Sequence, residues 1–344
     1  MSHRLACVLA RLFARTLACL LLAGGLASAA QAQAPSLGTD NLATFKGAQK
    51  VVIDHFGVEF ITTLKARGHG GGSSANIDAT LEGVSDEAMQ ALTERAYQDT
   101  VAALARAGFE VVQADELRAQ PLYQALMTKV GHDAPYVVDD TGAYSRIFVP
   151  AGMQAVFKSG ADNRGSLGDR MDAFNSKYQG EFSDVAKSLG VYLVRFNYLA
   201  SFGSTQSSKG FLANFTGKAR AAVQAGPTLM AKSTLMQIIS HEGARIFANS
   251  PRGGNATVWL EEPLTVKADG YALEDATSAD TKRSDGVANA LSIGLNLLTG
   301  GRSASMQSNK TMVVKLSEEN FNESYLRMIG EARDAFVEKL VASR

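Results

Sequence analysis

Residues 186–202 read AKSLGVYLVRFNYLASF and join the end of a helix to the strongest strand of the chain. We expect the helix to begin near Asp169 and to end at Gly190, and the strand to cover residues 191–202. Successive strand side chains point to opposite sides of a sheet. One face then carries Tyr192, Val194, Phe196, Tyr198 and Phe202, and the other carries Arg195, Asn197 and Ser201. The polar face is expected to become exposed to water towards the end of the strand.

A second strand is predicted upstream, at residues 51–61, VVIDHFGVEFI. Its apolar run gives way to alternation, which is typical of a strand that passes from the interior to an exposed edge. A helix follows between Ser85, a good N-cap residue, and Gly108, and residues 109–112 form the next strand. Strand, long helix and strand in this order predict a right-handed parallel crossover.

The rest of the chain predicts a mixed α/β to α+β fold, with packed helices on a mixed sheet, then antiparallel hairpins and a C-terminal helix. The remaining predicted elements are a short strand at 77–81, a helix at 121–131, strands at 146–149, 218–223, 228–240, 244–248, 257–260 and 312–316, and a helix at 317–341. Gly226-Pro227 and Glu242-Gly243 are interpreted as breaks between hairpin strands. We divide the chain into a signal peptide (1–32), a leader (33–48), an α/β core (49–205) and a hairpin region (206–344) packed with that core as one unit.

The N-terminal segment has the pattern of a secretory signal peptide. Three arginines precede a short apolar region at residues 17–26, and Ala30-Gln31-Ala32 matches a cleavage site. Cys7 and Cys19 both lie inside this segment, so the mature chain of about 310 residues would contain no cysteine. The pattern predicts a bacterial periplasmic or secreted protein.

The composition excludes several classes of protein. Hydrophobic residues make up 46% of the chain and charged residues 20%, which is typical of a globular protein. Lys and Arg number 34, and so do Asp and Glu, so no overall field favours nucleic acid. The mature part has no apolar run of 18 residues, so we expect no transmembrane helix.

Two segments carry a resemblance to a group of envelope proteins. They are the helix that ends in Ala107-Gly108-Phe109 and the run from Leu189 through Gly190 into the strand. Over residues 49–205 the pattern resembles the α/β core shared by the curli-secretion channel lipoprotein, the amino-terminal domain of the Tol-system propeller protein and related envelope lipoproteins. The resemblance implies a role in periplasmic assembly, secretion or envelope maintenance without catalysis. It transfers no functional residue, and Tyr192 stands where those proteins usually carry an acid.

A basic, glycine-rich segment at residues 65–74 is the candidate binding site. Its candidate residues are Lys65, Arg67, His69, Gly70, Gly71 and Gly72. The run His-Gly-Gly-Gly is similar to the oxyanion loop of esterases, in which backbone N–H groups face a developing negative charge. Such enzymes also need Gly-x-Ser-x-Gly, which is absent from this sequence. A mobile connecting loop is the favoured interpretation, and an anion cradle is the alternative.

Other polar motifs are incomplete, and we expect neither a metal site nor a cofactor. His241-Glu242 begins a zinc motif, but Arg245 stands where the second histidine is needed. Asp54 and His55 are neighbours on a strand and should point to opposite faces, so we interpret them as polar groups at a sheet end. Residues 203–210 resemble a phosphate loop but lack its second glycine.

The segment that begins at Val287 and ends at Leu298 has two interpretations. As a helix it would pack on the core. As a strand that returns through residues 303–314 it would form a hairpin for contact with another copy or with a membrane surface. The predicted partners are therefore an envelope protein or a second copy of the chain, with peripheral membrane contact through this segment and no nucleic acid.

Two functions remain open at this point. The first is an exported, non-catalytic periplasmic or envelope-associated protein that acts by binding or assembly. The second is a secreted hydrolase whose site is assembled from residues far apart in the sequence. A histidine with a carboxylate and a hydroxyl within hydrogen-bond reach would favour the hydrolase.

We expect the exported chain to be cleaved after Ala30 or Ala32, because the three parts of a signal peptide precede these positions. Mass spectrometry of the protein recovered from the periplasm should give the mass of a chain that starts at residue 31 or 33. Recovery of the chain with Met1 still attached would contradict the prediction.

Overall fold

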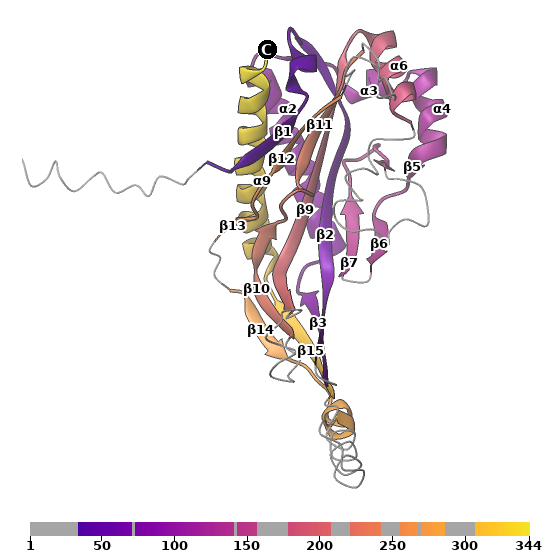
Figure 1. Ribbon diagram of the computed structural model, residues 1–344. Helices are drawn as coiled ribbons and strands as arrows, with labels where there is room; N and C mark the ends of the chain where they lie inside the picture. Colours follow the sequence, from indigo (N-terminus) through magenta and orange to yellow (C-terminus); the bar gives the residue numbers. More distant parts are fainter. Residues whose placement is uncertain are drawn as a thin grey trace, which may run out of the picture. The chain divides into compact units, whose positions relative to one another are not determined.

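The strand predicted at residues 191–202 lies in the middle of the main sheet as β9 (Tyr192–Ser207). The structure is a computed structural model, and it describes residues 34–70, 73–140, 143–156, 178–207, 221–241, 255–266, 270–285 and 307–344 (Figure 1). Residues Pro35–Arg344 form one compact unit. The main path of the sheet runs β1-β12-β11-β9-β2-β3-β15-β14.

The elements confirm the predicted class, a mixed sheet with packed helices, antiparallel hairpins and a C-terminal helix. The strands other than β9 are β1 (Leu37–Asp40), β2 (Lys50–Gly70), β3 (Ser73–Glu82), β4 (Glu110–Val111), β5 (Gly131–His132), β6 (Tyr136–Asp140), β7 (Ala143–Phe148), β8 (Ala155–Val156), β10 (Ala221–Leu229), β11 (Leu235–Ile239), β12 (Asn255–Leu260), β13 (Leu264–Thr265), β14 (Ala272–Asp275) and β15 (Gln307–Lys315). The helices are η1 (Leu42–Phe45), α2 (Asp86–Arg106), α3 (Ala114–Arg118), α4 (Pro121–Val130), α6 (Gln179–Leu189) and α9 (Glu318–Ala342). No helix within the described ranges is both long enough and apolar enough to cross a membrane.

The sheet contains both parallel and antiparallel pairs. β2 is parallel to β9 and to β4, so the expected parallel pairing across α2 is present. β15 is parallel to β3, and β9 is antiparallel to both β10 and β11. Strands from both halves of the sequence are therefore interleaved in one sheet.

The two long helices begin where their sequences predict. Ser85 caps α2, because its Oγ accepts a hydrogen bond from the backbone N–H of Ala88. Ser317 caps α9 in the same way through the N–H of Asn320. The Glu318 carboxylate also accepts hydrogen bonds from the N–H and the hydroxyl of Ser85, at 3.0 and 2.6 Å. This contact ties the first turns of α2 and α9 together.

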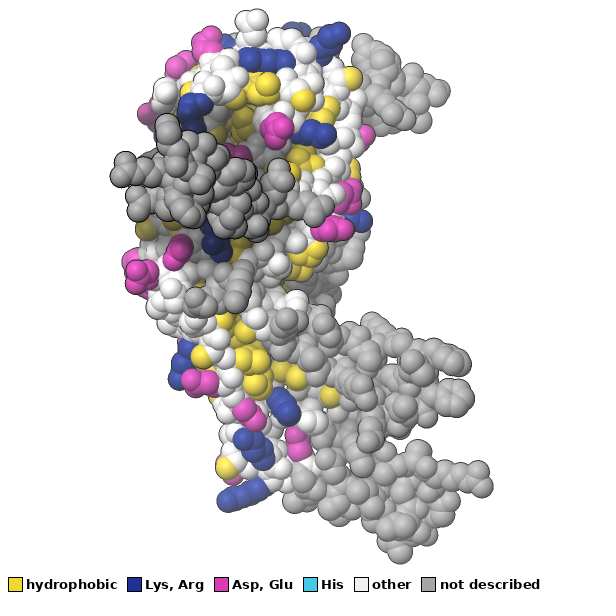
Figure 2. All heavy atoms as spheres, turned by 90° about the vertical axis from the view of Figure 1, so that its left-hand side faces the viewer, with side chains coloured by type: hydrophobic (Ala, Val, Ile, Leu, Met, Phe, Trp, Pro, Cys, Tyr) yellow, Lys and Arg dark blue, Asp and Glu magenta, His cyan; other side chains and the backbone are white. Residues whose placement is uncertain are grey.

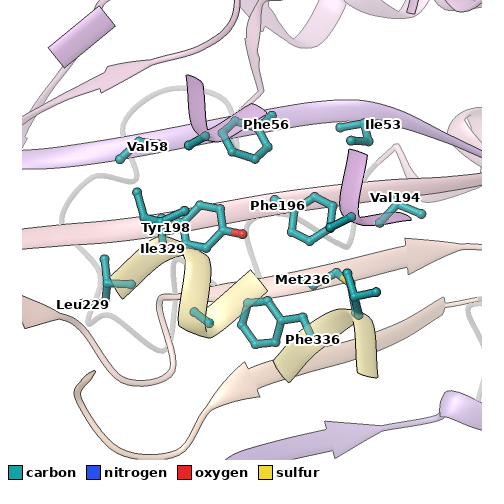
Figure 3. Close-up of a cluster of buried hydrophobic side chains, with 14 of the residues drawn as sticks. Ile53, Phe56, Val58, Val194, Phe196, Tyr198, Leu229, Met236, Ile329 and Phe336 are labelled. Atoms are coloured by element: carbon teal, nitrogen blue, oxygen red, sulfur yellow. The ribbon is translucent and has the colours of Figure 1, made fainter. Parts of the chain in front are cut away.

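The larger hydrophobic core lies between the sheet and the pair α2 and α9 (Figure 1). Phe56 of β2 and Phe196 and Tyr198 of β9 are fully buried there. The ring of Phe56 lies 6.0 Å from that of Phe196 and 5.6 Å from that of Tyr198. Figure 3 shows these rings beside Ile329 and Phe336 of α9, so the C-terminal helix closes the core built on the two central strands.

A second core covers the opposite face of the same strands. Val52 of β2 and Leu193 of β9 pack there against α3, α4 and α6, which contribute Leu117, Leu126 and Phe182. The face that was expected to become wet is therefore covered. Arg195 and Ser201 are 1% and 0% exposed, and Asn197 is also buried.

The first strand was also predicted to end at an exposed edge, and this is wrong. β7 pairs with β2 over residues 58–64, while β9 pairs with its other edge over residues 51–60. Residues 51–61 are buried throughout, because both edges and both faces of the strand are covered. The polar residues in this strand therefore lie inside the protein.

One break predicted in the second half differs from the structure. Gly226-Pro227 lies inside β10, where the register against β9 shifts between Ala225 and Thr228. The bulge accommodates the proline, so the strand continues through it. The strand predicted at 244–248, the break at Glu242-Gly243 and the ambiguous segment 287–298 lie outside the described residues.

We expect Phe196→Ala to reduce the free energy of unfolding by about 3–5 kcal/mol, the range for deleting a buried phenylalanine. Phe196 is fully buried between the central strands and α9. Urea unfolding would measure the loss, with Leu122→Ala as the control because Leu122 is 54% exposed. A loss below about 1 kcal/mol for Phe196→Ala would show that this core is not central to stability.

Candidate functional site

The glycine-rich segment is a hairpin and not a loop. β2 continues to Gly70 and β3 starts at Ser73, with Lys65 opposite Asp78 and Gly70 opposite Ser73. Only Gly71 and Gly72 separate the strands, and both lie outside the described residues. Residues up to Gly70 and from Ser73 onward therefore belong to two paired strands and not to an extended loop.

The positive charges of this hairpin have acidic partners. Lys65 Nζ lies 3.5 Å from a carboxylate oxygen of Asp139, and Arg67 lies 2.5 Å from a carboxylate oxygen of Asp78. His69 and Gly70 belong to β2, and their surroundings are not described. The described part of the hairpin thus pairs each cation with an acid and does not gather them around one point.

A buried polar cluster lies instead at Asp54 and His55, which were interpreted as groups at a sheet end. Asp54 is 2% exposed and His55 is fully buried, in the middle of the sheet. The register of β2 against β9 shifts here, because Ile53 faces Val194 while His55 faces Arg195. Asp54 is therefore the extra residue of a β-bulge, and the rule that neighbouring side chains alternate does not hold across it.

Arg195 of β9 holds the Asp54 carboxylate. Its Nε and Nη2 donate hydrogen bonds of 2.8 and 2.7 Å to the same oxygen, Oδ2. The guanidinium also lies 3.7 Å from the centre of the Phe182 ring on α6, a cation–π contact. The charged pair is thus enclosed by the sheet on one side and by α6 on the other.

The second carboxylate oxygen of Asp54, Oδ1, accepts neither of these two hydrogen bonds from Arg195. Oδ1 is buried and has no hydrogen-bond partner among the described residues. Burial raises the pKa of Asp54 above its ordinary value, and the charge of Arg195 only partly offsets this effect. The site therefore contains a buried acceptor that is able to take one more hydrogen bond.

His55 lies in the same cluster as a neutral imidazole. Burial, together with the positive charge of Arg195, lowers its pKa from 6.5 to about 3. Gly57 provides room for the ring, because a Cβ at this position would lie 2.7 Å from His55 Nε2. A histidine with so low a pKa is a poor general base at neutral pH.

A cavity of about 270 Å³ lies beside Asp54. Its lining residues come from β2, α3, α4 and the segment before β8: Ile53, Asp54, Ala114, Leu117, Arg118, Tyr123, Gln124, Met127, Thr128, Gly152, Met153 and Gln154. Gln124, Thr128 and Gly152 are exposed and mark its rim, whereas Asp54 and Tyr123 are buried. We name this space the Asp54 cavity.

Tyr123 connects the cavity wall to the bulge. Its hydroxyl donates a 3.0 Å hydrogen bond to the backbone carbonyl of Asp54, which belongs to the part of β2 between its pairings with β4 and β7. Burial raises the pKa of Tyr123 above its ordinary value. The phenol therefore keeps its proton and serves as a fixed donor to this carbonyl.

Two other hollows lack a comparable group. A hollow of about 530 Å³ beside β10 and β13 is lined by apolar, small and hydroxyl side chains, without a charged one. A hollow of about 580 Å³ includes Arg344, but its guanidinium already donates to the carbonyls of Ala48 and Gly108, at 3.1 and 2.7 Å. The Asp54 cavity is distinguished by Asp54 in its wall, whose buried Oδ1 has no hydrogen-bond partner among the described residues.

The remaining motifs from the sequence do not converge on this site. The ring of His241 packs edge-on against Tyr192, with ring centres 5.1 Å apart. Trp259 is half-buried on β12 and donates from Nε1 to Glu261 at 3.0 Å. In the part of the chain that the structure describes, no three His, Cys, Asp or Glu side chains lie close enough together to hold a metal ion.

Comparison with protein families, with curated proteins and with solved structures gives no match to this chain. Its function has to be inferred from its own residues. The sequence did contain a sign of the site, because the β2 residues that belong to the larger core change from odd positions (Val51, Ile53) to even positions (Phe56, Val58) across Asp54 and His55. Such a change of parity indicates a bulge.

We expect His55 to make the protein less stable in mild acid. The unfolded chain takes up a proton near pH 6.5, whereas the folded protein resists protonation of His55 until about pH 3. The contribution of neutral His55 to the free energy of unfolding is therefore complete above pH 6.5, and it is lost as the pH falls from there towards 3. Between pH 7 and pH 5 the loss should be about 2 kcal/mol.

Urea unfolding of the wild type and of His55→Gln at pH 7 and pH 5 would measure this contribution. Asp54, whose raised pKa acts in the opposite direction, is present in both proteins, so the difference between them isolates His55. An equal loss of stability in the two proteins would contradict the assignment of a neutral buried imidazole.

Proposed function

We propose that this chain is an exported protein of the bacterial envelope that acts by binding, without catalysis, and that the Asp54 cavity is its binding site. The observation that carries the proposal is the buried Oδ1 of Asp54, a residue that lines the cavity. An unpaired buried acceptor is unfavourable by about 1–3 kcal/mol. A bound molecule that donates to this oxygen would remove that penalty.

The ionisable groups of the site favour binding over proton transfer. The Asp54 carboxylate accepts two hydrogen bonds from Arg195 at Oδ2, so this oxygen belongs to a buried ion pair. His55 is neutral, and the high pKa of Tyr123 keeps its phenol protonated. These features give less support to the alternative of a secreted hydrolase.

Export and an envelope location rest on the signal-peptide pattern at residues 1–32 and on the resemblance described for residues 49–205. The described surface is compatible with this setting. In Figure 2, Lys and Arg side chains are interspersed with Asp and Glu over the described part of that face, so they form no single-signed field for nucleic acid. An envelope protein or a second copy remains the proposed partner, with membrane contact through residues 287–298.

Native mass spectrometry of the protein recovered from the periplasm tests the proposal. We expect one small molecule to remain bound per chain of the wild type. Ala114 is half-buried and lines the cavity, so Ala114→Phe should fill part of the space and remove the adduct. Ala119→Phe is the matched control, because Ala119 lies exposed just beyond the same helix.

The control protein should keep the adduct. An adduct of equal abundance in Ala114→Phe would place binding elsewhere, and a wild type without any adduct would contradict the proposal. Far-ultraviolet circular dichroism of the three proteins establishes that each is folded.

A further inference from the structure

The Asp54 cavity also restricts the kind of molecule that it holds. The residues that line it combine Asp54, whose buried Oδ1 has no hydrogen-bond partner among the described residues, with apolar side chains that include Leu117, Met127 and Met153. Methionine side chains adapt to ligands of irregular shape. A ligand therefore needs a polar end that donates a hydrogen bond and a body that replaces water on apolar surface.

The charges around the cavity disfavour an ionised ligand. Arg195 donates two hydrogen bonds to the Asp54 carboxylate and offsets its negative charge, so little net charge remains to attract a cation. Arg118 adds a second guanidinium at the wall, where a Cβ on Gly152 would lie 3.0 Å from its Nη1. An anion is also disfavoured at the polar end, because Oδ1 accepts hydrogen bonds and donates none.

The volume limits the size of the ligand. A cavity of about 270 Å³ corresponds to roughly nine water molecules at about 30 Å³ each. It lies just below the range of about 300–1,000 Å³ that is usual for drug-sized ligands. A body the size of a single six-membered ring with a short substituent fits this space.

We infer that the Asp54 cavity binds a small neutral molecule with a single-ring-sized apolar body and one hydroxyl or N–H group, which donates a hydrogen bond to Asp54 Oδ1. This inference rests on the proposed function, since it names the ligand class of the same site. The ring lies against Met127 and Met153, and the donor points towards the bulge of β2.

Phenol and anisole form a matched pair of probes, because both carry one aromatic ring and one oxygen but only phenol donates a hydrogen bond. Titration calorimetry of the full mature chain should give one phenol site per chain. A hydrogen bond to a charged acceptor contributes about 1.5–3 kcal/mol, so phenol should bind about 10- to 100-fold more tightly than anisole. Benzylamine, the cationic probe of similar size, should bind more weakly than phenol.

The position of the probe can be measured with methyl-labelled methionine. Phenol should shift the NMR signals of Met127 and Met153 and leave that of Met328 unchanged, because Met328 is not among the residues that line the cavity. Ala114→Phe should lose these shifts, and Ala119→Phe should keep them. Asp54→Asn is not a suitable test of binding, because it would leave the charge of Arg195 buried without its Asp54 partner. Ala114→Phe, which fills the cavity, is used instead.

Each outcome has one meaning. Equal binding of phenol and anisole would overturn the inferred hydrogen bond to Oδ1, because the hydroxyl of phenol would then add nothing to the affinity. Binding at the cavity would still stand. Tighter binding of benzylamine would overturn the inferred neutrality. If neither phenol nor anisole binds while the native adduct is lost in Ala114→Phe, the inferred ligand class is wrong and the proposed function stands. If that adduct is also absent from the wild type, both are wrong.

Discussion

The buried ion pair between Asp54 and Arg195 joins the two central strands at the one point where their register shifts. Before the shift, Val51 and Ile53 face α2 and α9, and after it Phe56, Val58 and Phe60 face the same core. A regular strand would turn these three residues to the opposite face. The partner strand β9 keeps its aromatic residues on one face, at Tyr192, Phe196 and Tyr198, so the bulge in β2 is what brings the two apolar sets together.

The same shift creates the site. An ion pair taken out of water is usually unfavourable relative to apolar side chains of similar size, so its presence requires good geometry. Arg195 supplies two short hydrogen bonds and a contact with Phe182, but both bonds reach Oδ2. Oδ1 is left buried, without a hydrogen-bond partner among the described residues, on a residue of the cavity wall. The interaction that sets the register therefore also supplies the group on which we base the binding proposal.

Local sequence signals predicted much of the fold. Ser85 and Ser317 cap the two long helices, and Gly190 ends α6 with a left-handed backbone at φ 63°, because caps depend on a few neighbouring residues. Burial of the polar face of β9 was missed, since it depends on α6 and the cavity wall, which pack there from distant parts of the chain. Asp54 and His55 were placed at a sheet end because the alternation rule assumes a regular strand. The glycine hairpin was taken for a loop because its run of glycines concealed the alternation of Lys65, Ala66 and Arg67.

Unfolding measurements on Asp54→Leu, Arg195→Met and the double variant test the central role of the ion pair most directly. Each single change leaves one buried charge without its partner, so each should lower the free energy of unfolding by about 3–5 kcal/mol. The double variant removes both charges and should lose less than the sum of the two, which gives a coupling of more than about 1 kcal/mol. Single losses below about 1 kcal/mol, or strictly additive losses, would show that the register of β2 and β9 does not depend on this pair.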